Sequence, residues 1–339
     1  MGSIGYRIDA CSTLAIRQVL ERGRPFSDSY VVEAIFRSWP IVATPKPIAH
    51  PSLIYLRHTG QRGVPRCGMC CKLGGQSADV FTVSIKLAIH RSEEKTMKAI
   101  VTGHTRGLGQ AMASALLGRG IPVLGLARRE CPELPKQFPE LLQQATVDLA
   151  DPGALQTWLD GDVLDSYLAG ATSMLLINNA GMLGPVAPLG RQERDPLVQA
   201  VNLNITAPLQ LSNVLARKYL GPLRIAHISS GAGRSAFAGW SIYGATKAAL
   251  DHHARCAAAD CLSRLRICSI APGVIDTDMQ ATIRRTPAED FPLLDRFLAL
   301  KHQGELASPA NVAERMVRHL LSEDFGIEAV ADLRSLPPA

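Results

Sequence analysis

The sequence predicts an α/β protein with a doubly wound parallel sheet, formed as a single domain by residues 97–339. Short apolar strands alternate with helical segments throughout this part of the chain. A glycine-rich turn joins its first strand to its first helix, a connection typical of nucleotide-binding sheets. A serine then follows a later strand, and a tyrosine and a lysine lie on the next helix. These three observations also indicate where the functional site should lie.

Residues 1–96 show no sustained helical or strand periodicity, and prolines punctuate their middle. They carry thirteen Lys and Arg against seven Asp and Glu, whereas residues 97–339 carry 23 of each, so the net charge of +6 belongs to the first segment. We expect this segment to be a disordered N-terminal extension or the product of an upstream start. The native chain would then begin at Met97, directly before the first strand.

Several classes of function are disfavoured by composition. The neutral charge balance of residues 97–339 argues against nucleic-acid binding, and the diffuse N-terminal charge forms no basic amphipathic helix. No apolar run reaches membrane-spanning length, and the scattered cysteines of this part indicate a cytoplasmic protein. Cys67 and Cys70 form one CxxC pair without a second pair at zinc-site spacing, so we expect no metal.

The first predicted strand, Lys98–Thr102, leads into a glycine turn and a helix that runs through Leu117. Gly103, Gly107 and Gly109 allow a tight turn and the close approach of a pyrophosphate, while the first N–H groups of the helix face the anion. The glycine spacing is GxxxGxG rather than GxGxxG. This turn predicts a dinucleotide site.

The second predicted strand, Val123–Leu126, is followed closely by Arg128 and Arg129. A site for NAD usually has an acidic residue here for the ribose 2′-hydroxyl, whereas arginines suit a 2′-phosphate. Arg106 could reach the same phosphate. Glu130 remains available for the acidic role, and the arginines could also be merely solvated, but we expect NADP.

The third and fourth strands are expected at Ala145–Asp148 and Ser173–Ile177. Asp148 would meet the adenine, and Asp151 caps the helix that starts at the following proline. The fourth strand ends in Asn178–Gly181, whose amides could tie strand ends together.

The remaining elements complete the alternation. A long helix carries Asn202, whose amide needs a partner, so we expect a kink or a bound water there. The helix that bears Tyr243 continues to about Leu262 with many alanines, which indicates a subunit interface. Residues 279–305 should form a helical flap over the substrate. The last elements are a strand at Arg266–Ile270, a helix at Ser308–Leu321 and a strand near Ile327–Ala331.

Ser230, Tyr243 and Lys247 form the candidate catalytic group. Tyr243 and Lys247 are four residues apart, so their side chains share a helix face. An ammonium beside a phenol lowers the phenol pKa from about 10, so the tyrosine can exchange a proton with a carbonyl oxygen near neutral pH. Ser230 would hold that oxygen by a hydrogen bond.

Residues 97–339 resemble the short-chain dehydrogenase/reductase family. The matching motifs are TGHTRGLG at Thr102–Gly109, NNAG at Asn178–Gly181, Asn202, Ser230, YGATK at Tyr243–Lys247 and PGVIDT at Pro272–Thr277. The resemblance implies a Rossmann fold and a catalytic set of Asn202 (holding a relay water), Ser230, Tyr243 and Lys247. It implies cofactor contacts from Gly103, Thr105, Arg106, Gly107, Leu108, Gly109, Arg128, Arg129, Asp148, Leu149, Asn179, Ala180, Gly181, Tyr243, Lys247, Pro272, Gly273, Ile275 and Thr277.

Within this family the C-terminal half resembles the sepiapterin reductases and the bacterial benzil reductases. The likeness lies in Gly239-Trp240, Asp276–Gln280, Leu298–Lys301, Asp324-Phe325 and Asp332. It implies substrate contacts from Ser230, Trp240, Met279 and Asp332, the last holding a pterin. The turn Ser230–Arg234 lacks the bulky residues expected beside a pterin.

The sequence therefore predicts an NADPH-dependent carbonyl reductase that acts on a small-molecule ketone or vicinal diketone. The chain should form a homodimer or a homotetramer. Two alternatives remain: a catalytically idle NADP-binding regulator on the same fold, and a 3-oxoacyl or sugar-type alcohol dehydrogenase of the same family.

Overall fold

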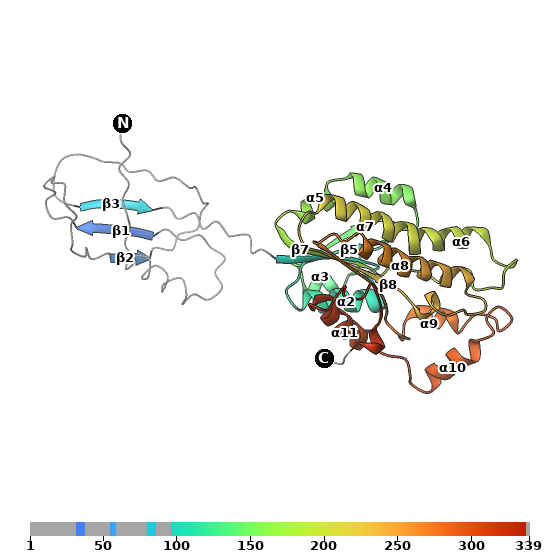
Figure 1. Ribbon diagram of the computed structural model, residues 1–339. Coiled ribbons are helices and arrows are strands. Elements are labelled where there is room, and N and C mark those ends of the chain that lie inside the picture. The colour runs from blue at the N-terminus through green and yellow to red at the C-terminus, as the bar shows by residue number, and fades with distance from the viewer. Residues whose placement is uncertain (1–31, 38–54, 59–79, 86–95, 337–339) are drawn as a thin grey trace. The chain divides into compact units, whose positions relative to one another are not determined.

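The computed structural model describes residues 32–37, 55–58, 80–85 and 96–336, and the chain divides into two compact units, Met1–Glu93 and Glu94–Ala339 (Figure 1). In the first unit, β1 (Val32–Arg37), β2 (Tyr55–His58) and β3 (Val80–Ile85) form an antiparallel sheet in the order β2-β1-β3. The sequence did not predict these strands, because four to six residues are too few to establish a period. The CxxC pair lies outside the described residues.

The second unit is built on a seven-stranded sheet in the order β10-β9-β8-β7-β4-β5-β6, with parallel pairing throughout. This sheet confirms the predicted fold class. Its strands are β4 (Thr96–Thr102), β5 (Val123–Ala127), β6 (Leu142–Thr146), β7 (Ala171–Asn178), β8 (Leu223–Ile228), β9 (Leu265–Ala271) and β10 (Val330–Asp332).

Two strand boundaries differ from the prediction in informative ways. β6 starts at Leu142, earlier than predicted, and ends at Thr146, because an edge strand tolerates the polar pair Gln143-Gln144 that the apolar pattern excluded. β4 starts at Thr96, and Met97 already pairs with Ser173 of β7. The first strand therefore includes Met97 instead of following it.

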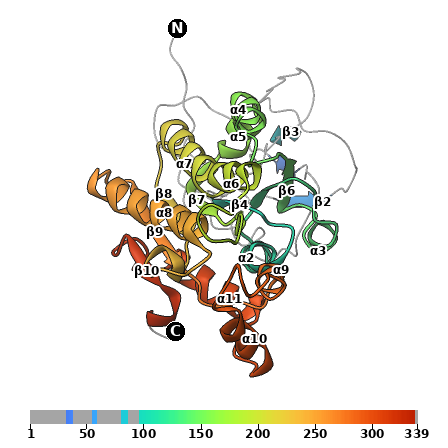
Figure 2. The ribbon, with the colours of Figure 1, turned by 90° about the vertical axis from the view of Figure 1, so that its right-hand side faces the viewer.

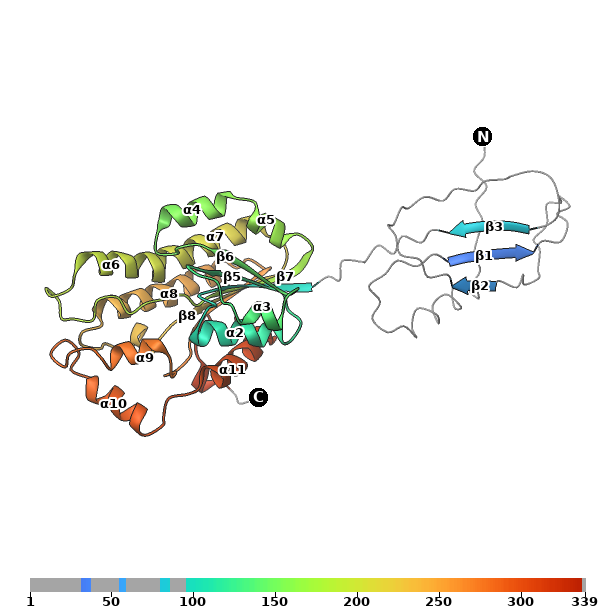
Figure 3. The same ribbon diagram turned by 180° about the vertical axis from the view of Figure 1, so that it is seen from behind.

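Helices cover both faces of the sheet (Figures 1 and 3). Their bounds are α2 (Gly107–Leu117), α3 (Leu134–Gln137), α4 (Pro152–Asp160), α5 (Val163–Leu168), α6 (Arg194–Val201), α7 (Ala207–Lys218), α8 (Ser241–Ala259), α9 (Asp278–Ile283), α10 (Leu294–His302) and α11 (Pro309–Leu321). α9 and α10 lie on the same side as α2 and α11 (Figures 2 and 3). They occupy the segment predicted as a helical flap.

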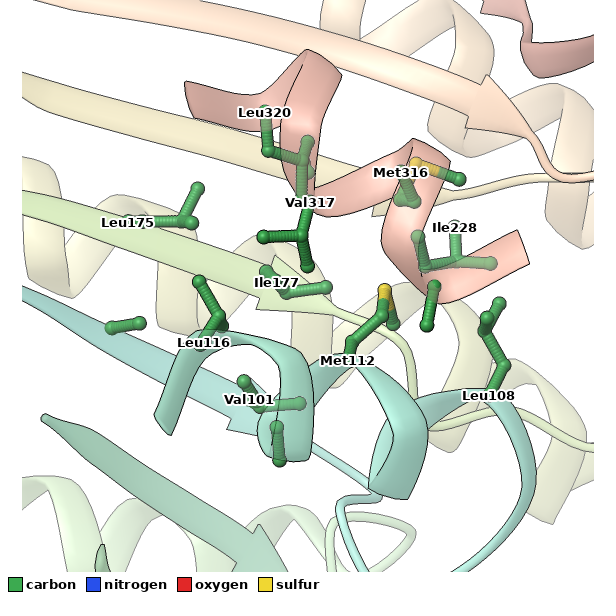
Figure 4. Close-up of a cluster of buried hydrophobic side chains, with 14 of the residues drawn as sticks. Val101, Leu108, Met112, Leu116, Leu175, Ile177, Ile228, Met316, Val317 and Leu320 are labelled. Carbon is green, nitrogen blue, oxygen red and sulfur yellow. The ribbon is translucent and has the colours of Figure 1, made fainter. Parts of the chain in front are cut away.

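The hydrophobic core lies in two layers, one on each face of the sheet. On one face, Met112 and Leu116 of α2 pack with Met316 and Val317 of α11 over strand residues such as Ile177 (Figure 4). The other layer joins α4, α5 and α7 to the opposite face. Each large side chain buried this way contributes about 1.5–3 kcal/mol, so both helix layers are held firmly on the sheet.

The strand order reverses between β4 and β7. From β4 the chain adds β5 and β6 on one side of the sheet, and from β7 it adds β8, β9 and β10 on the other side. In open parallel sheets the crevice at such a point, beyond the carboxyl ends of the strands, is where ligands bind. The turns after β4, β7 and β8 meet there. Among the described residues, no helix combines the length and apolarity needed to cross a bilayer.

We propose that residues 97–339 fold independently of the first 96, because the parallel sheet and both core layers come from the second unit. A chain that begins at Met97 should be soluble, melt within a few degrees of the full chain and keep its activity. Thermal unfolding and activity of the two chains, compared side by side, check this. An insoluble or inactive short chain would show that residues 1–96 are needed.

Candidate active site

A cavity of about 1390 Å³ lies beyond the carboxyl ends of the strands. Every residue predicted to contact the cofactor lines it, from the glycine turn to Thr277. Ser230, Trp240 and Met279 line the same cavity, whereas Asn202 and Asp332 do not. The fold thus brings the predicted cofactor residues into one space with Ser230, Tyr243 and Lys247.

The glycine turn forms an anion cradle at one end of this cavity. Gly107 has φ +56°, in the left-handed region that favours glycine, and it opens α2. Arg106 precedes the helix without capping it through its side chain, and the first turn holds no acidic residue. The first N–H groups of α2 therefore remain available for a phosphate, and these residues fit a dinucleotide.

Asn179 ties the ends of β4 and β7 together. Its side-chain amide donates to the carbonyl oxygens of Thr102 (2.9 Å) and Gly103 (3.3 Å), and its backbone N–H donates to Thr102 Oγ1 (2.9 Å). This is the structural role that the sequence left open for the asparagine pair. It fixes the glycine turn relative to the strand beside it.

The three arginines predicted at the 2′-phosphate position are not equivalent. Arg128 and Arg129 are exposed, line the cavity and form no ion pair with any residue that the structure describes. Arg106 instead pairs with Asp278 of α9 at 2.9 Å, and both side chains are exposed. Arg106 must leave this weak surface pair before it can bind a phosphate. Glu130 lines the cavity as well.

His104 supports the glycine turn from behind, a role that the sequence analysis missed. Its ring is fully buried, with Nε2 2.6 Å from Gln144 Oε1 on the edge strand β6. A Cβ on Gly125 would lie 2.4 Å from this ring, so the ring occupies the space above a glycine of β5. Burial lowers the histidine pKa and favours the neutral ring. A glycine inside a predicted strand was the available signal.

Ser230, Tyr243 and Lys247 line the same cavity. Tyr243 and Lys247 are 7% and 5% exposed, and the lysine Nζ lies 5.6 Å from the tyrosine ring centroid. Lys247 Nζ donates to the carbonyl oxygen of Ile228 at 2.8 Å. Ser230 precedes a short helical turn, η2 (Gly231–Gly233), and its hydroxyl accepts from the N–H of Ala232.

The pKa values of this group are set mainly by burial. Burial raises the pKa of Tyr243, and its interaction with the Ser230 hydroxyl opposes the rise. Burial lowers the pKa of Lys247 to about 8, and the carboxylate of Asp251 opposes that shift. The pKa of Tyr243 is thus raised in this structure, and the lowering expected from Lys247 stays a prediction.

Asn202 does not reach the catalytic group, and this corrects the sequence analysis. Its side chain donates to the carbonyl of Ala150 at 3.1 Å. Asn204 is fully buried instead: its Oδ1 accepts from the N–H of Met182 at 2.9 Å, and its Nδ2 donates to Thr246 Oγ1 at 3.1 Å. Asn204 Oδ1 and Lys247 Nζ lie 3.3 and 3.5 Å from where a Cβ on Gly181 would be, so the two side chains are neighbours.

A π-helical segment, η1 (Asn202–Thr206), places this amide between α6 and α7. Such segments are rare and often occur at functional sites. The interruption agrees with the predicted kink in this helix. The asparagine whose side chain lies near Lys247 is two positions further along the chain than predicted, and it is buried behind the cavity wall rather than lining the cavity.

An aromatic cluster forms the wall beside Tyr243. The Trp240 ring is stacked on Phe291 (centroids 4.8 Å apart) and meets Tyr243 edge-on at 5.5 Å. Phe297 and the partly buried Met279 belong to the same apolar cluster. The part of the cavity beside Tyr243 therefore has an aromatic and apolar wall, and Gln280, Arg284 and Arg296 line the cavity as well.

Asp332 is not placed to hold a substrate. Its carboxylate accepts from the Arg334 side chain at 2.7 and 3.0 Å and from the Arg334 backbone N–H at 2.9 Å. These bonds hold the aspartate pKa below its usual value. Arg334 lines the cavity and Asp332 does not. The Asp332 carboxylate is therefore paired with Arg334 in this structure, and its predicted contact with a pterin stays a prediction.

Comparison with known proteins agrees with this geometry. The short chain dehydrogenase family profile matches residues 97–288. The chain belongs to this family, and so it is an oxidoreductase acting on carbonyl or alcohol groups.

Individual relatives are similar over the same part of the chain. An (S)-benzoin-forming benzil reductase from Bacillus cereus is 36% identical over 235 residues, 67% of this chain and 94% of the relative. A sepiapterin reductase from Meriones unguiculatus is 33% identical over 251 residues, 69% and 94% of the two chains. A short-chain dehydrogenase/reductase crystal structure from Burkholderia vietnamiensis is 42% identical with a TM-score of 0.52, covering 72% of this chain and 99% of the other.

The two asparagines provide a matched test of the site. Asn204→Ala should reduce kcat more than tenfold, because it removes the amide beside Lys247, while Asn202→Ala should keep most of the activity. Steady-state kinetics of both variants, with thermal unfolding as a control for folding, check this. The opposite ranking would return the role to Asn202.

Proposed function

We propose that this chain is an NADPH-dependent carbonyl reductase that transfers hydride to a ketone or a vicinal diketone. One observation carries the proposal: Ser230, Tyr243 and Lys247 line the same cavity as the glycine turn of α2. A dinucleotide held by that turn would extend toward the catalytic group. A regulator without activity would have no use for a buried phenol and a buried ammonium, both costly to remove from water.

The residues of the chain supply positioning and a proton. The reduced nicotinamide, when bound, supplies the hydride for the carbonyl carbon. Ser230 donates a hydrogen bond to the carbonyl oxygen, and Tyr243 gives that oxygen its proton. Because burial raises the pKa of Tyr243, the phenol is protonated at neutral pH, as a proton donor must be. Lys247 binds the nicotinamide ribose, and Asn204 holds the water through which the proton is replaced.

The walls of the cavity favour an apolar diketone over a pterin as substrate. The cluster around Trp240 offers aromatic faces, and Asp332 is occupied by Arg334. The relatives include a benzil reductase as well as a sepiapterin reductase. A panel of vicinal diketones, sepiapterin and quinones, assayed with NADPH and with NADH, tests this directly. We expect the highest kcat/KM for an aromatic diketone; activity on none of them would contradict the proposed reaction.

Tyr243→Phe should reduce turnover to less than a few per cent of wild type, because it removes the proton donor. NADPH binding should stay nearly intact, since the pyrophosphate cradle is formed by the start of α2 and Tyr243 belongs to α8. Fluorescence titration with NADPH separates binding from turnover. Tyr219→Phe is the matched control, because Tyr219 is equally buried but bonds the carbonyl of Ala171 outside the cavity. Substantial activity in the Tyr243 variant would refute the mechanism.

NADPH should be preferred over NADH by more than about tenfold in kcat/KM, because a charge-assisted hydrogen bond contributes about 1.5–3 kcal/mol. Arg128→Ala and Arg129→Ala should each raise the KM for NADPH and leave that for NADH unchanged. Arg255→Ala, an exposed arginine on α8 that does not line the cavity, serves as the control. Equal specificity constants for the two cofactors in the wild type would show that these arginines face solvent.

We also propose that the enzyme is a cytoplasmic homodimer or homotetramer. The alanine-rich end of α8, where Ala258 and Ala259 are exposed, supports close helix contact between subunits. The mass in solution, measured by light scattering, tests the oligomeric state.

A further inference from the structure

The turn that carries Ser230 is fastened to α8 by an ion pair that has no assigned role, between a partly exposed arginine and a buried aspartate. Arg234 ends this turn, and its Nε donates to Asp251 Oδ2 at 2.9 Å. Asp251 is 2% exposed and lies on α8, four residues after Lys247 and therefore on the same helix face. The pair thus joins the serine and the lysine of the catalytic group.

Further hydrogen bonds hold this pair in place. The other carboxylate oxygen, Asp251 Oδ1, accepts from Ser269 Oγ of β9 at 2.7 Å, and Ser269 is fully buried. Arg234 also donates to the carbonyl oxygen of Ala331 on the edge strand β10 at 2.9 Å. Both oxygens of this buried carboxylate accept hydrogen bonds, one from Arg234 and one from Ser269. The Asp251 carboxylate on α8 is therefore bonded to both the Ser230 turn and β9.

We propose that Asp251 is a positioning residue for the catalytic lysine: its carboxylate, held by Arg234 and Ser269, keeps Lys247 protonated and keeps the Ser230 turn seated on α8. The inference rests on the proposed catalytic role of Lys247. It also accounts for the arginine in the serine turn, which the substrate resemblance did not explain. Arg234 bonds to Asp251 of α8 and to Ala331 of β10, and in this proposal it acts on Lys247 through Asp251.

Among the described groups around Lys247, the negative charge comes from Asp251, because the others are neutral or positive. On α8, Tyr243 is neutral, because burial raises its pKa. On β8, the backbone carbonyl of Ile228 accepts from Nζ, and burial together with His253 and Lys247 lowers the pKa of His227 to about 3, so its ring is neutral. Asn204 on η1 carries no charge. Arg234 is positive and reaches the lysine only across Asp251.

The balance at Lys247 gives the direction of the effect. Burial favours the neutral amine and lowers the lysine pKa to about 8, while Asp251 favours the ammonium. Removal of the Asp251 charge must therefore lower the lysine pKa further. In the wild type, kcat/KM for NADPH should fall above about pH 8, as the ammonium is lost.

The test compares pH profiles of matched variants. Asp251→Asn should move the alkaline limit of kcat/KM from about pH 8 to about pH 7, since an opposite charge nearby shifts a pKa by about 1–3. Ser269→Ala removes a hydrogen bond to the same carboxylate but keeps its charge, so its limit should stay in place. If the alkaline limit of kcat/KM is the same in Asp251→Asn as in the wild type, the proposal is overturned.

A double variant guards against loss of folding. Asp251→Asn leaves Arg234, whose side chain is 28% exposed, beside a neutral partner, whereas Arg234→Met with Asp251→Leu removes both charges of the pair and places an apolar side chain at the buried position 251. The alkaline limit of kcat/KM should be lowered in this double variant as well. A pH profile equal to that of the wild type would show that the Arg234–Asp251 pair has a structural role alone.

A direct measurement separates this inference from the proposed function. Titration of isotope-labelled lysine side chains by NMR, with Lys247→Met to assign the signal, reports the lysine pKa without turnover. A pKa for Lys247 that is equal in wild type and Asp251→Asn overturns the inference even if the enzyme reduces ketones. Absence of activity on every carbonyl would contradict the function alone.

Discussion

The catalytic arrangement depends on one contact, the packing of the Ser230 turn against the backbone of α8. A Cβ on Gly233 would lie 2.8 Å from the carbonyl carbon of Lys247, so no side chain fits between turn and helix. The serine hydroxyl, the phenol and the ammonium are therefore placed by the main chain itself. The turn follows β8, which pairs with β9 in a continuous parallel register. A stable sheet therefore keeps the positions of these three side chains fixed.

Burial sets a second requirement, because it works against the charges that the site uses. The same exclusion of water that strengthens polar interactions in the cavity raises the pKa of Tyr243 and lowers that of Lys247. The neighbouring groups offset these shifts. Ser230 favours the phenolate, Asp251 favours the ammonium, and the Ile228 carbonyl gives the ammonium a hydrogen bond. These three groups therefore oppose the effect of burial on the two side chains.

The sequence predicted the sheet, the glycine turn and the Ser230, Tyr243 and Lys247 group, since each follows from local pattern and spacing. It assigned the wrong asparagine because residues 202 and 204 lie on different sides of a helix, and a π-helical segment decides which of them lies near Lys247. It placed Asp332 at the substrate because nothing local shows that Arg334, two residues later, occupies the carboxylate. Tertiary partners decide such roles, and sequence spacing does not contain them.

The His104 ring above Gly125 has a consequence for how this chain can vary. The glycine turn, the β5 backbone and Gln144 of β6 share one small volume, with the ring filling it. Any side chain at position 125 requires a smaller residue at position 104, and that exchange would remove the ring's bond to Gln144 and leave Gln144 with its hydrogen bonds to Cys131. Positions 104 and 125 should therefore change together among related chains or in a directed-evolution library, although one belongs to a turn and the other to a strand. The glycine turn is therefore coupled to the edge strand β6 through the His104 ring.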